Sequence, residues 1–188
     1  DGFLIINEMH KPFLDNIMPF FTLLGDGVTA VIIAILMALL SIRKSIFLLI
    51  SYTFSGVAVQ LLKRLVFPDS ARPLAYFRDL GIEIYTIPGL DIPLRHSFPS
   101  GHTATAFAMF VGISFLVKRW YYKVLFLLLA IIVGYSRIYL AMHFPSDVIA
   151  GSLLGVLTAY LCFIWISGWK KSWLDVSLWL RLKNAIKK

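Results

Sequence analysis

The sequence predicts an all-α protein, a polytopic membrane helical bundle of about five transmembrane helices in this chain plus an N-terminal surface helix. First, 59% of the 188 residues are hydrophobic and 15% are charged, whereas soluble domains contain about 25% charged residues. Second, five apolar stretches approach or reach the length of about 20 residues that a membrane span needs. Third, the basic residues stand in short clusters between these stretches, as in membrane proteins. This arrangement predicts a bilayer as partner and argues against a nucleic-acid partner.

The five predicted spans follow one another within a single domain that covers residues 1–188. They cover about residues 27–42, 46–62, 102–117, 124–140 and 148–166. Residues 63–99 form an outer loop, in which Pro88-Gly89 indicates a turn and residues 81–87 alternate like a short extended stretch. Gly151 and Gly155, four residues apart in the last span, indicate close helix packing.

The two ends of the chain differ from the spans. Residues 1–25 mix apolar side chains with Glu8, Lys11 and Asp15, which predicts an interfacial segment on the outer surface or only partly inserted. Residues 169–188 form a basic cytoplasmic tail. Its pattern indicates either an amphipathic helix on the inner leaflet, from Trp173 to Leu180, or a solvated tail.

Counting Lys and Arg residues orients the bundle. With the turn at Arg43 and Lys44 placed inside, eleven of the 18 basic residues are cytoplasmic and nine of the ten acidic residues lie on the other side. An excess of positive charge inside is the usual arrangement. Trp120, Trp165 and Trp169 then mark the inner interface. The single cysteine, Cys162, permits no disulfide framework and has no basic neighbour in sequence that would activate its thiol.

Ionisable and small polar residues gather at the outer ends of the predicted spans. Such groups at membrane depth are costly and indicate a functional site. Lys63, Arg72 and Arg137 would supply positive charge for a phosphate, the arginines by bidentate contacts. Ser100 and Gly101 precede an apolar helix, so we expect their backbone N–H groups to be unpaired and to point at an anion.

Two histidines and a carboxylate complete this set. His143 and Asp147 are four residues apart, with Pro145 at the expected start of a helix. The carboxylate can accept the proton of one imidazole nitrogen, which leaves the other nitrogen free to attack phosphorus. His102 can protonate the leaving oxygen and later activate water. This chemistry requires no metal and no other cofactor.

Each of these residues, taken alone, also has a purely structural explanation. Lys63 and Arg64 could be snorkelling interface residues. Ser100 could be only a helix N-cap, and Asp147 a partner of the helix dipole. Either histidine could serve packing, and Arg137 could pair with an acidic neighbour. Their joint placement at one membrane face favours a functional site.

At these residues the chain resembles the type-2 phosphatidic acid phosphatase family of membrane lipid phosphatases. Residues 99–102 match its central P-S-G-H signature, and Ser136-Arg137 followed by His143 and Asp147 matches its third signature. The first signature, a Lys followed by Arg-Pro, departs from the family. Six residues usually separate the two parts there, whereas eight separate Lys63 from Arg72 and seven separate Arg64 from Arg72. Either basic residue could therefore be the first phosphate contact, and residue type favours Lys63.

The resemblance implies metal-independent hydrolysis of a lipid phosphate or diphosphate headgroup through a phosphohistidine. His143 would be the nucleophile, Asp147 its orienting group and His102 the acid–base. The implied phosphate ligands are Lys63, Arg72, Ser100, Gly101 and Arg137.

The chain is similar to bacterial undecaprenyl-diphosphate phosphatases of this family, which implies a bacterial inner-membrane protein with its site facing the periplasm or exterior. Undecaprenyl diphosphate is the expected substrate, with phosphatidylglycerophosphate and lipid A phosphates as competitors. Arg78, Arg95 and His96 of the outer loop could touch the headgroup. A lipid phosphotransferase could use the same site. The five spans disfavour a vanadate-dependent haloperoxidase, and the complete set of catalytic residues disfavours a non-catalytic binding protein. The sequence indicates no oligomeric state.

Overall fold

The computed structural model describes residues 2–180, and every regular element in that range is helical. This confirms the predicted all-α class. The longer helices are α2 (Pro12–Leu23), α3 (Gly27–Leu40), α4 (Ile42–Leu61), α6 (Gly101–Leu116), α7 (Trp120–Tyr139) and α8 (Pro145–Ser167). The short elements are α1 (Gly2–Asn7), a π-helical turn (Leu62–Val66), α5 (Pro73–Asp79) and a 3-10 turn (Ser172–Asp175).

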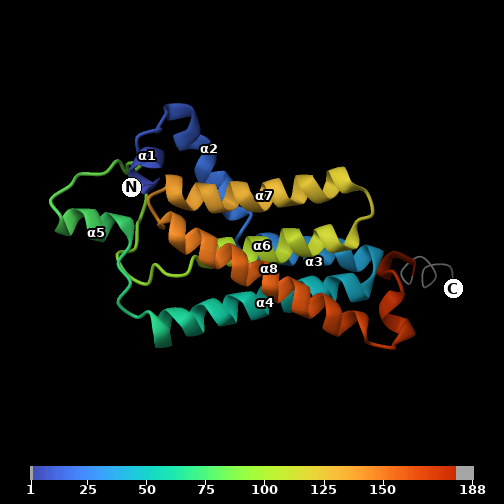
Figure 1. Ribbon diagram of the computed structural model, residues 1–188. Helices are drawn as coiled ribbons and strands as arrows, with labels where there is room; N and C mark the ends of the chain where they lie inside the picture. The colour runs from blue at the N-terminus through green and yellow to red at the C-terminus, as the bar shows by residue number, and fades with distance from the viewer. Residues whose placement is uncertain (1, 181–188) are drawn as a thin grey trace.

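The five predicted spans coincide with α3, α4, α6, α7 and α8, which lie side by side in one bundle (Figure 1). Among the described residues, three helices are long and apolar enough to cross a membrane: α4 with its π-helical turn, α7 and α8. Helices α2 and α3 pass the same criterion together, with a bend of 57° between them. By length and composition the described residues thus hold three spans, or four if this bent pair is one span, against the five that the sequence predicts. Several apolar helices of this kind make the chain an integral membrane protein.

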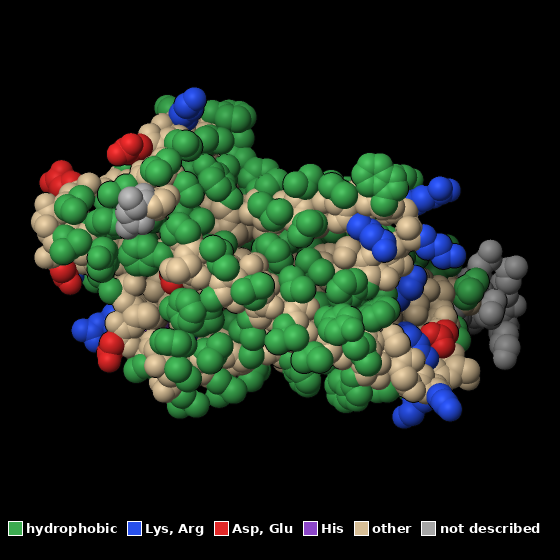
Figure 2. All heavy atoms as spheres, viewed as in Figure 1, with side chains coloured by type: hydrophobic (Ala, Val, Ile, Leu, Met, Phe, Trp, Pro, Cys, Tyr) green, Lys and Arg blue, Asp and Glu red, His purple; other side chains and the backbone are tan. Residues whose placement is uncertain are grey.

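The molecule has two chemically different ends. The loop end carries α1, α5 and residues 67–99, and the tail end carries the loop between α6 and α7 and the described C-terminal residues (Figure 1). Figure 2 shows hydrophobic side chains across the middle of the visible face, basic side chains gathered at the tail end, and most acidic side chains at the loop end. This distribution is the charge asymmetry that the sequence predicts.

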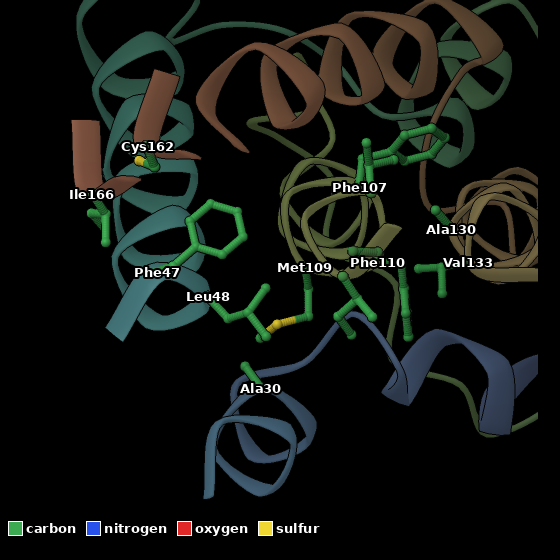
Figure 3. Close-up of a cluster of buried hydrophobic side chains, with 13 residues drawn as sticks. Ala30, Phe47, Leu48, Phe107, Met109, Phe110, Ala130, Val133, Cys162 and Ile166 are labelled. Carbon is green, nitrogen blue, oxygen red and sulfur yellow. The ribbon is translucent and has the colours of Figure 1, made fainter. Parts of the chain in front are cut away.

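Helix α6 lies at the centre of the bundle, and each of its residues from Thr103 to Ile113 is buried. Figure 3 shows its side chains Met109 and Phe110 against Leu48 of α4 and Val133 of α7. Because protein rather than lipid surrounds it, α6 does not need the full length of a lipid-exposed span.

Helix α8 approaches the backbone of α6 through its two glycines. A Cβ atom at Gly151 would lie 2.5 Å from the carbonyl oxygen of Ser100, and one at Gly155 would lie 2.3 Å from that of Ala104. Both distances are shorter than a C–H···O contact of about 3.3 Å. The prediction that these glycines serve close helix packing is confirmed, and this packing brings the first turns of α6 and α8 together.

At the loop end, the N-terminal segment and the long loop are tied to each other and to α7. Asn7 exchanges two hydrogen bonds of 2.9 Å with the backbone of Tyr85. Asp15 accepts from the hydroxyls of Tyr85, at 2.9 Å, and Tyr139, at 2.6 Å. Residues 82–87 have no strand partner within the described chain, so the predicted extended stretch is an irregular segment held by these side chains.

At the tail end, Arg43 holds residues 171–175 against the bundle. Its guanidinium donates to Asp175 at 2.6 Å and to the carbonyl of Ile166 at 2.8 Å. Residues Ser172–Asp175 form a 3-10 turn, so the tail does not begin as one continuous amphipathic helix. The last basic residues of the predicted tail, 181–188, lie outside the described residues.

Candidate active site

The structure brings all eight predicted site residues to the loop end of the bundle, at six places along the chain. Hydrogen bonds to backbone carbonyls join these places: the N–H of Ser100 donates to the carbonyl of Asp147 at 2.9 Å, and Arg72 Nη1 donates to the carbonyl of Met142 at 3.1 Å. The site residues are Lys63 in the π-helical turn, Arg72 before α5, Ser100, Gly101 and His102 at the start of α6, Arg137 in the last turn of α7, His143 between α7 and α8, and Asp147 in the first turn of α8.

His143 and Asp147 form a buried pair. His143 Nδ1 lies 3.2 Å from Asp147 Oδ2, and the two residues are 2% and 3% exposed. The same oxygen accepts the backbone N–H of Phe144 at 3.0 Å. The turn that carries the imidazole is fixed because the N–H groups of Met142 and His143 both donate to the carbonyl of Arg137, at 3.0 and 3.2 Å. Among residues 2–180, no group hydrogen-bonds to Nε2 of His143.

Burial lowers the pKa of His143 below its ordinary value. The hydrogen bond to Asp147 opposes this shift, and the positive charges of Arg72, Arg137 and Lys63 add to it. The imidazole is therefore neutral at neutral pH, with its Nδ1 proton directed to the carboxylate and a free lone pair on Nε2.

Three buried cations stand near this pair without an acidic partner. Lys63 and Arg137 are 7% exposed and Arg72 is 9% exposed, and none of the three has a carboxylate within 4.0 Å among the described residues. Their hydrogen bonds go to neutral oxygens, such as the carbonyl of His96 for Lys63 at 2.7 Å and the hydroxyl of Thr22 for Arg137 at 2.6 Å. The buried Nε of Arg137 has no partner in the described chain. Buried charges of one sign are expensive unless a counter-ion neutralises them.

The π-helical turn separates Lys63 from Arg64, which the sequence left as alternatives. Lys63 points inward and lines a cavity of about 500 Å³ together with Arg72. Arg64 is exposed at its rim. A π-helical turn has more residues per turn than an α-helical one, which is consistent with the longer spacing before Arg72.

The first turn of α6 only partly matches the predicted anion cradle. The N–H of Ser100 is bound to the carbonyl of Asp147, and its hydroxyl pairs with Thr103 Oγ1 at 2.8 Å. The prediction that this N–H points at an anion is therefore wrong, because close packing of α6 on α8 supplies a carbonyl partner. Gly101 and His102 occupy the first helical turn, where backbone N–H groups have no intrahelical acceptor.

A largely apolar groove of about 560 Å³ lies between α4, the start of α6 at Gly101 and His102, and Gly25 and Asp26 just before α3. Its apolar lining includes Val57, Leu61 and Leu65. Gln60 and Arg64 line both this groove and the cationic cavity, so the two spaces adjoin.

Ser97 is a site residue that sequence reasoning missed. Its hydroxyl is 1% exposed and donates to Asp147 Oδ2 at 2.5 Å. Its position three residues before Ser100 was the only signal in the sequence, and serines in loops are too common for that spacing to be informative.

This chain is similar to known membrane phosphatases in both sequence and structure. The family model described as PAP2 superfamily matches residues 44–171. A lipid A 1-phosphatase of Rhizobium etli is 39% identical over 109 residues, which are 58% of this chain and 44% of that protein. An undecaprenyl-diphosphatase of Sulfolobus acidocaldarius is 38% identical over 69 residues, 37% of this chain and 33% of that protein. The chain thus spans less than half the length of these curated relatives.

Among solved structures, the crystal structure of Aquifex aeolicus LpxE superposes with a TM-score of 0.74 at 29% identity. The match covers 86% of this chain and 92% of that one. The similarity therefore extends beyond the signature residues to the arrangement of the helices.

Proposed function

The chain belongs to the PAP2 superfamily, and from that premise we propose that it removes phosphate from a lipid headgroup through a phosphohistidine at His143. One observation carries the proposal. Three buried cations without carboxylate partners, Lys63, Arg72 and Arg137, act electrostatically on a neutral histidine whose Nε2 is free in the described chain. A phosphate group is the anion that such a cluster fits, and arginine fits it in a bidentate manner.

The first half of the reaction forms the phosphoenzyme. Nε2 of His143 attacks phosphorus, the P–N bond forms and the bond to the lipid oxygen breaks. His102 gives its proton to that oxygen, and Asp147 accepts the hydrogen bond from Nδ1 and stabilises the charge that develops on the imidazole. Lys63, Arg72 and Arg137, with the first-turn N–H groups of α6, stabilise the equatorial oxygens.

The second half releases inorganic phosphate. Water attacks phosphorus opposite the P–N bond and gives its proton to His102, and the P–N bond breaks to restore neutral His143. His143 is then neutral and His102 is protonated, as both were before the reaction. The proton that His102 gives up in the first half of the reaction is thus taken back in the second.

The adjoining groove supports a lipid as the leaving group. With the phosphate between Lys63 and Arg72, the rest of the molecule would pass over Gln60 and Arg64 into the apolar groove. His102 lines the groove from the first turn of α6, which suits a general acid for the lipid oxygen. We assign the loop end to the outer or periplasmic side of a bacterial inner membrane, because the basic residues gather at the other end.

Within this class, lipid A 1-phosphate and undecaprenyl diphosphate are the two substrates to compare. The chain is similar to phosphatases named for each of them, over a longer stretch for the first. On this ground we rank lipid A 1-phosphate as the first candidate substrate, whereas the sequence alone favours undecaprenyl diphosphate.

A panel of phosphate-release assays in detergent tests the proposal. Lipid A, undecaprenyl diphosphate, phosphatidylglycerophosphate and phosphatidate are offered to the wild type and to His143→Ala, without any acceptor alcohol. Release from at least one lipid by the wild type alone supports a phosphatase. No release from any of the four, or equal release by the variant, would overturn the proposal, and phosphate transfer that requires an acceptor would indicate a phosphotransferase.

A further inference from the structure

Three hydrogen-bond donors converge on one oxygen of the Asp147 carboxylate, and one of them comes from outside the α7–α8 turn. His143 and Phe144 donate from within that turn, whereas Ser97 donates from the long loop at 2.5 Å. Ser97 Oγ also lies 3.4 Å from His143 Nδ1. The serine hydroxyl therefore contacts both members of the buried pair.

The loop segment that presents this hydroxyl is held by the cationic half of the site. Lys63 Nζ donates to the carbonyl of His96, and Arg72 Nε donates to the carbonyl of Arg95, at 2.7 and 3.0 Å. His96 has a φ of 55°, a left-handed conformation that a non-glycine residue rarely adopts without support from its surroundings. The backbone just before Ser97 is thus turned toward α8 by bonds from two proposed phosphate ligands.

A second anchor fixes the other side of Ser97. Its N–H donates to the carbonyl of Ser70 at 3.0 Å, and the N–H of Phe98 donates to Ser70 Oγ at 3.1 Å. Bonds on both sides leave little freedom to the serine side chain, which is 1% exposed. Because the hydroxyl is held in place by the loop, its hydrogen bond can fix the position of the Asp147 carboxylate.

We propose that Ser97 is a positioning residue, whose hydroxyl holds the Asp147 carboxylate so that His143 presents Nε2 to phosphorus. The inference rests on the proposed phosphatase function and adds to it a group outside the three family signatures. Because the loop segment is itself held by Lys63 and Arg72, Ser97 links the orientation of the nucleophile to the cations that bind phosphate.

Removing the hydroxyl should affect the rate more than binding. Ser97→Ala deletes a charge-assisted hydrogen bond, and the loss of such a bond corresponds to roughly a 10- to 100-fold effect. We expect kcat to fall by roughly that factor while KM changes little, since the hydroxyl of Ser97 bonds to His143 and Asp147 and not to the proposed phosphate ligands. Ser114→Ala is a matched control, because Ser114 Oγ donates only to the carbonyl of Val111 in its own helix, at 2.6 Å.

The pH profile should move as well. The charged groups that act on His143 are Asp147, Lys63, Arg72 and Arg137, and none of them changes in the variant. Without the serine, the carboxylate loses a donor that stabilises its charge, so the His143–Asp147 pair binds a proton more readily. The acid limb of kcat/KM should shift to higher pH in Ser97→Ala, which a simple loosening of the loop would not produce.

A double-mutant cycle separates positioning through Asp147 from a general structural role. The rates of wild type, Ser97→Ala, Asp147→Asn and the double variant are measured on the lipid that the wild type hydrolyses. If Ser97 acts through Asp147, Ser97→Ala costs little further rate once Asp147→Asn is present. Equal losses in both backgrounds, or a wild-type rate and pH profile in Ser97→Ala, would overturn the inference.

Folding and function have separate readouts in this experiment. Thermal melting in detergent reports whether each variant folds, and Ser97→Cys, which keeps a weaker donor of similar size, replaces Ser97→Ala if the latter does not fold. An intermediate rate for the cysteine variant supports the inference, and a wild-type rate contradicts it. An inactive wild type on every lipid would instead overturn the proposed function, so the two failures are distinguishable.

Discussion

A methyl group at Gly151 should damage the active site by separating α8 from the first turn of α6. In Gly151→Ala the new Cβ would lie 2.5 Å from the carbonyl oxygen of Ser100 and 3.3 Å from Cβ of Thr103. The carbonyl is backbone, so no side-chain rotation can relieve the contact. The two helices must therefore move apart where Ser100 and Asp147 are hydrogen-bonded.

The size of the effect follows from that distance. Carbon–oxygen contacts in proteins start at about 3.3 Å, so a contact of 2.5 Å requires a displacement of about 0.8 Å. Misplacing catalytic groups by about 1 Å can cost roughly 100-fold in rate. We expect kcat to fall by roughly 10- to 100-fold, with a lower melting temperature because glycine-mediated helix contact is lost.

Phosphate release and thermal melting in detergent measure both effects. Gly168→Ala is the matched control, since it lies at the other end of α8 with its nearest neighbouring atom at 3.4 Å from the built Cβ, an ordinary contact. Wild-type kcat in Gly151→Ala would show that the α6–α8 contact does not position the catalytic groups, and the reasoning would fail. Equal losses in the control would point to a general effect on the membrane bundle.

Four further outcomes test other parts of the proposal. His143→Ala should abolish turnover and eliminate any phosphoenzyme trapped by acid quench, and a trapped phosphoenzyme in this variant would identify a different nucleophile. Burial lowers the pKa of His143, and the neutral form attacks. In a pH series, kcat/KM should therefore stay high as the pH falls through about 6.5, the ordinary histidine value, and decline only below it. An acid-limb midpoint at or above that value would contradict a lowered pKa. EDTA should leave phosphate release unchanged, and strong inhibition that added metal reverses would return a metal to the mechanism. Thr22→Val removes the acceptor of Arg137 Nη1 and should lower kcat/KM by roughly tenfold, whereas Thr158→Val, which loses only a bond within α8, should match the wild type.

Most of the helices could be read from the sequence because hydropathy is a local property. The five predicted spans lie on α3, α4, α6, α7 and α8, with ends that differ by a few residues. Hydropathy is less informative for the segment before Leu24, because its polar residues suggest a surface location. In the structure Asp15 and Asn7 satisfy hydrogen bonds from the loop and α7, which a local pattern does not reveal.

Lys63 illustrates the limit of signature matching. Counting residues from Arg72 left Lys63 and Arg64 as alternatives, because spacing along a sequence does not state how a helix ends. A π-helical turn at the end of α4 directs Lys63 inward and leaves Arg64 exposed. The loop helix α5 and the 3-10 turn near Asp175 were likewise missed, since both are short and are held by distant partners.

The sequence by itself determined the all-α membrane class and the proximity of His143 to Asp147, and the resemblance of its signatures indicated the family. The first two features depend on apolar length and on a spacing of four residues across a turn, which are short-range properties of the chain. Only the tertiary structure decided that Ser100 donates to Asp147, that Ser97 completes the hydrogen bonding of the carboxylate, and that three buried cations lack an acidic partner in the described chain. These features depend on segments far apart in sequence. The bond from Ser100 to Asp147 requires α6 and α8 to pack closely at Gly151 and Gly155, and Ser97 is placed by bonds to Ser70 in the long loop.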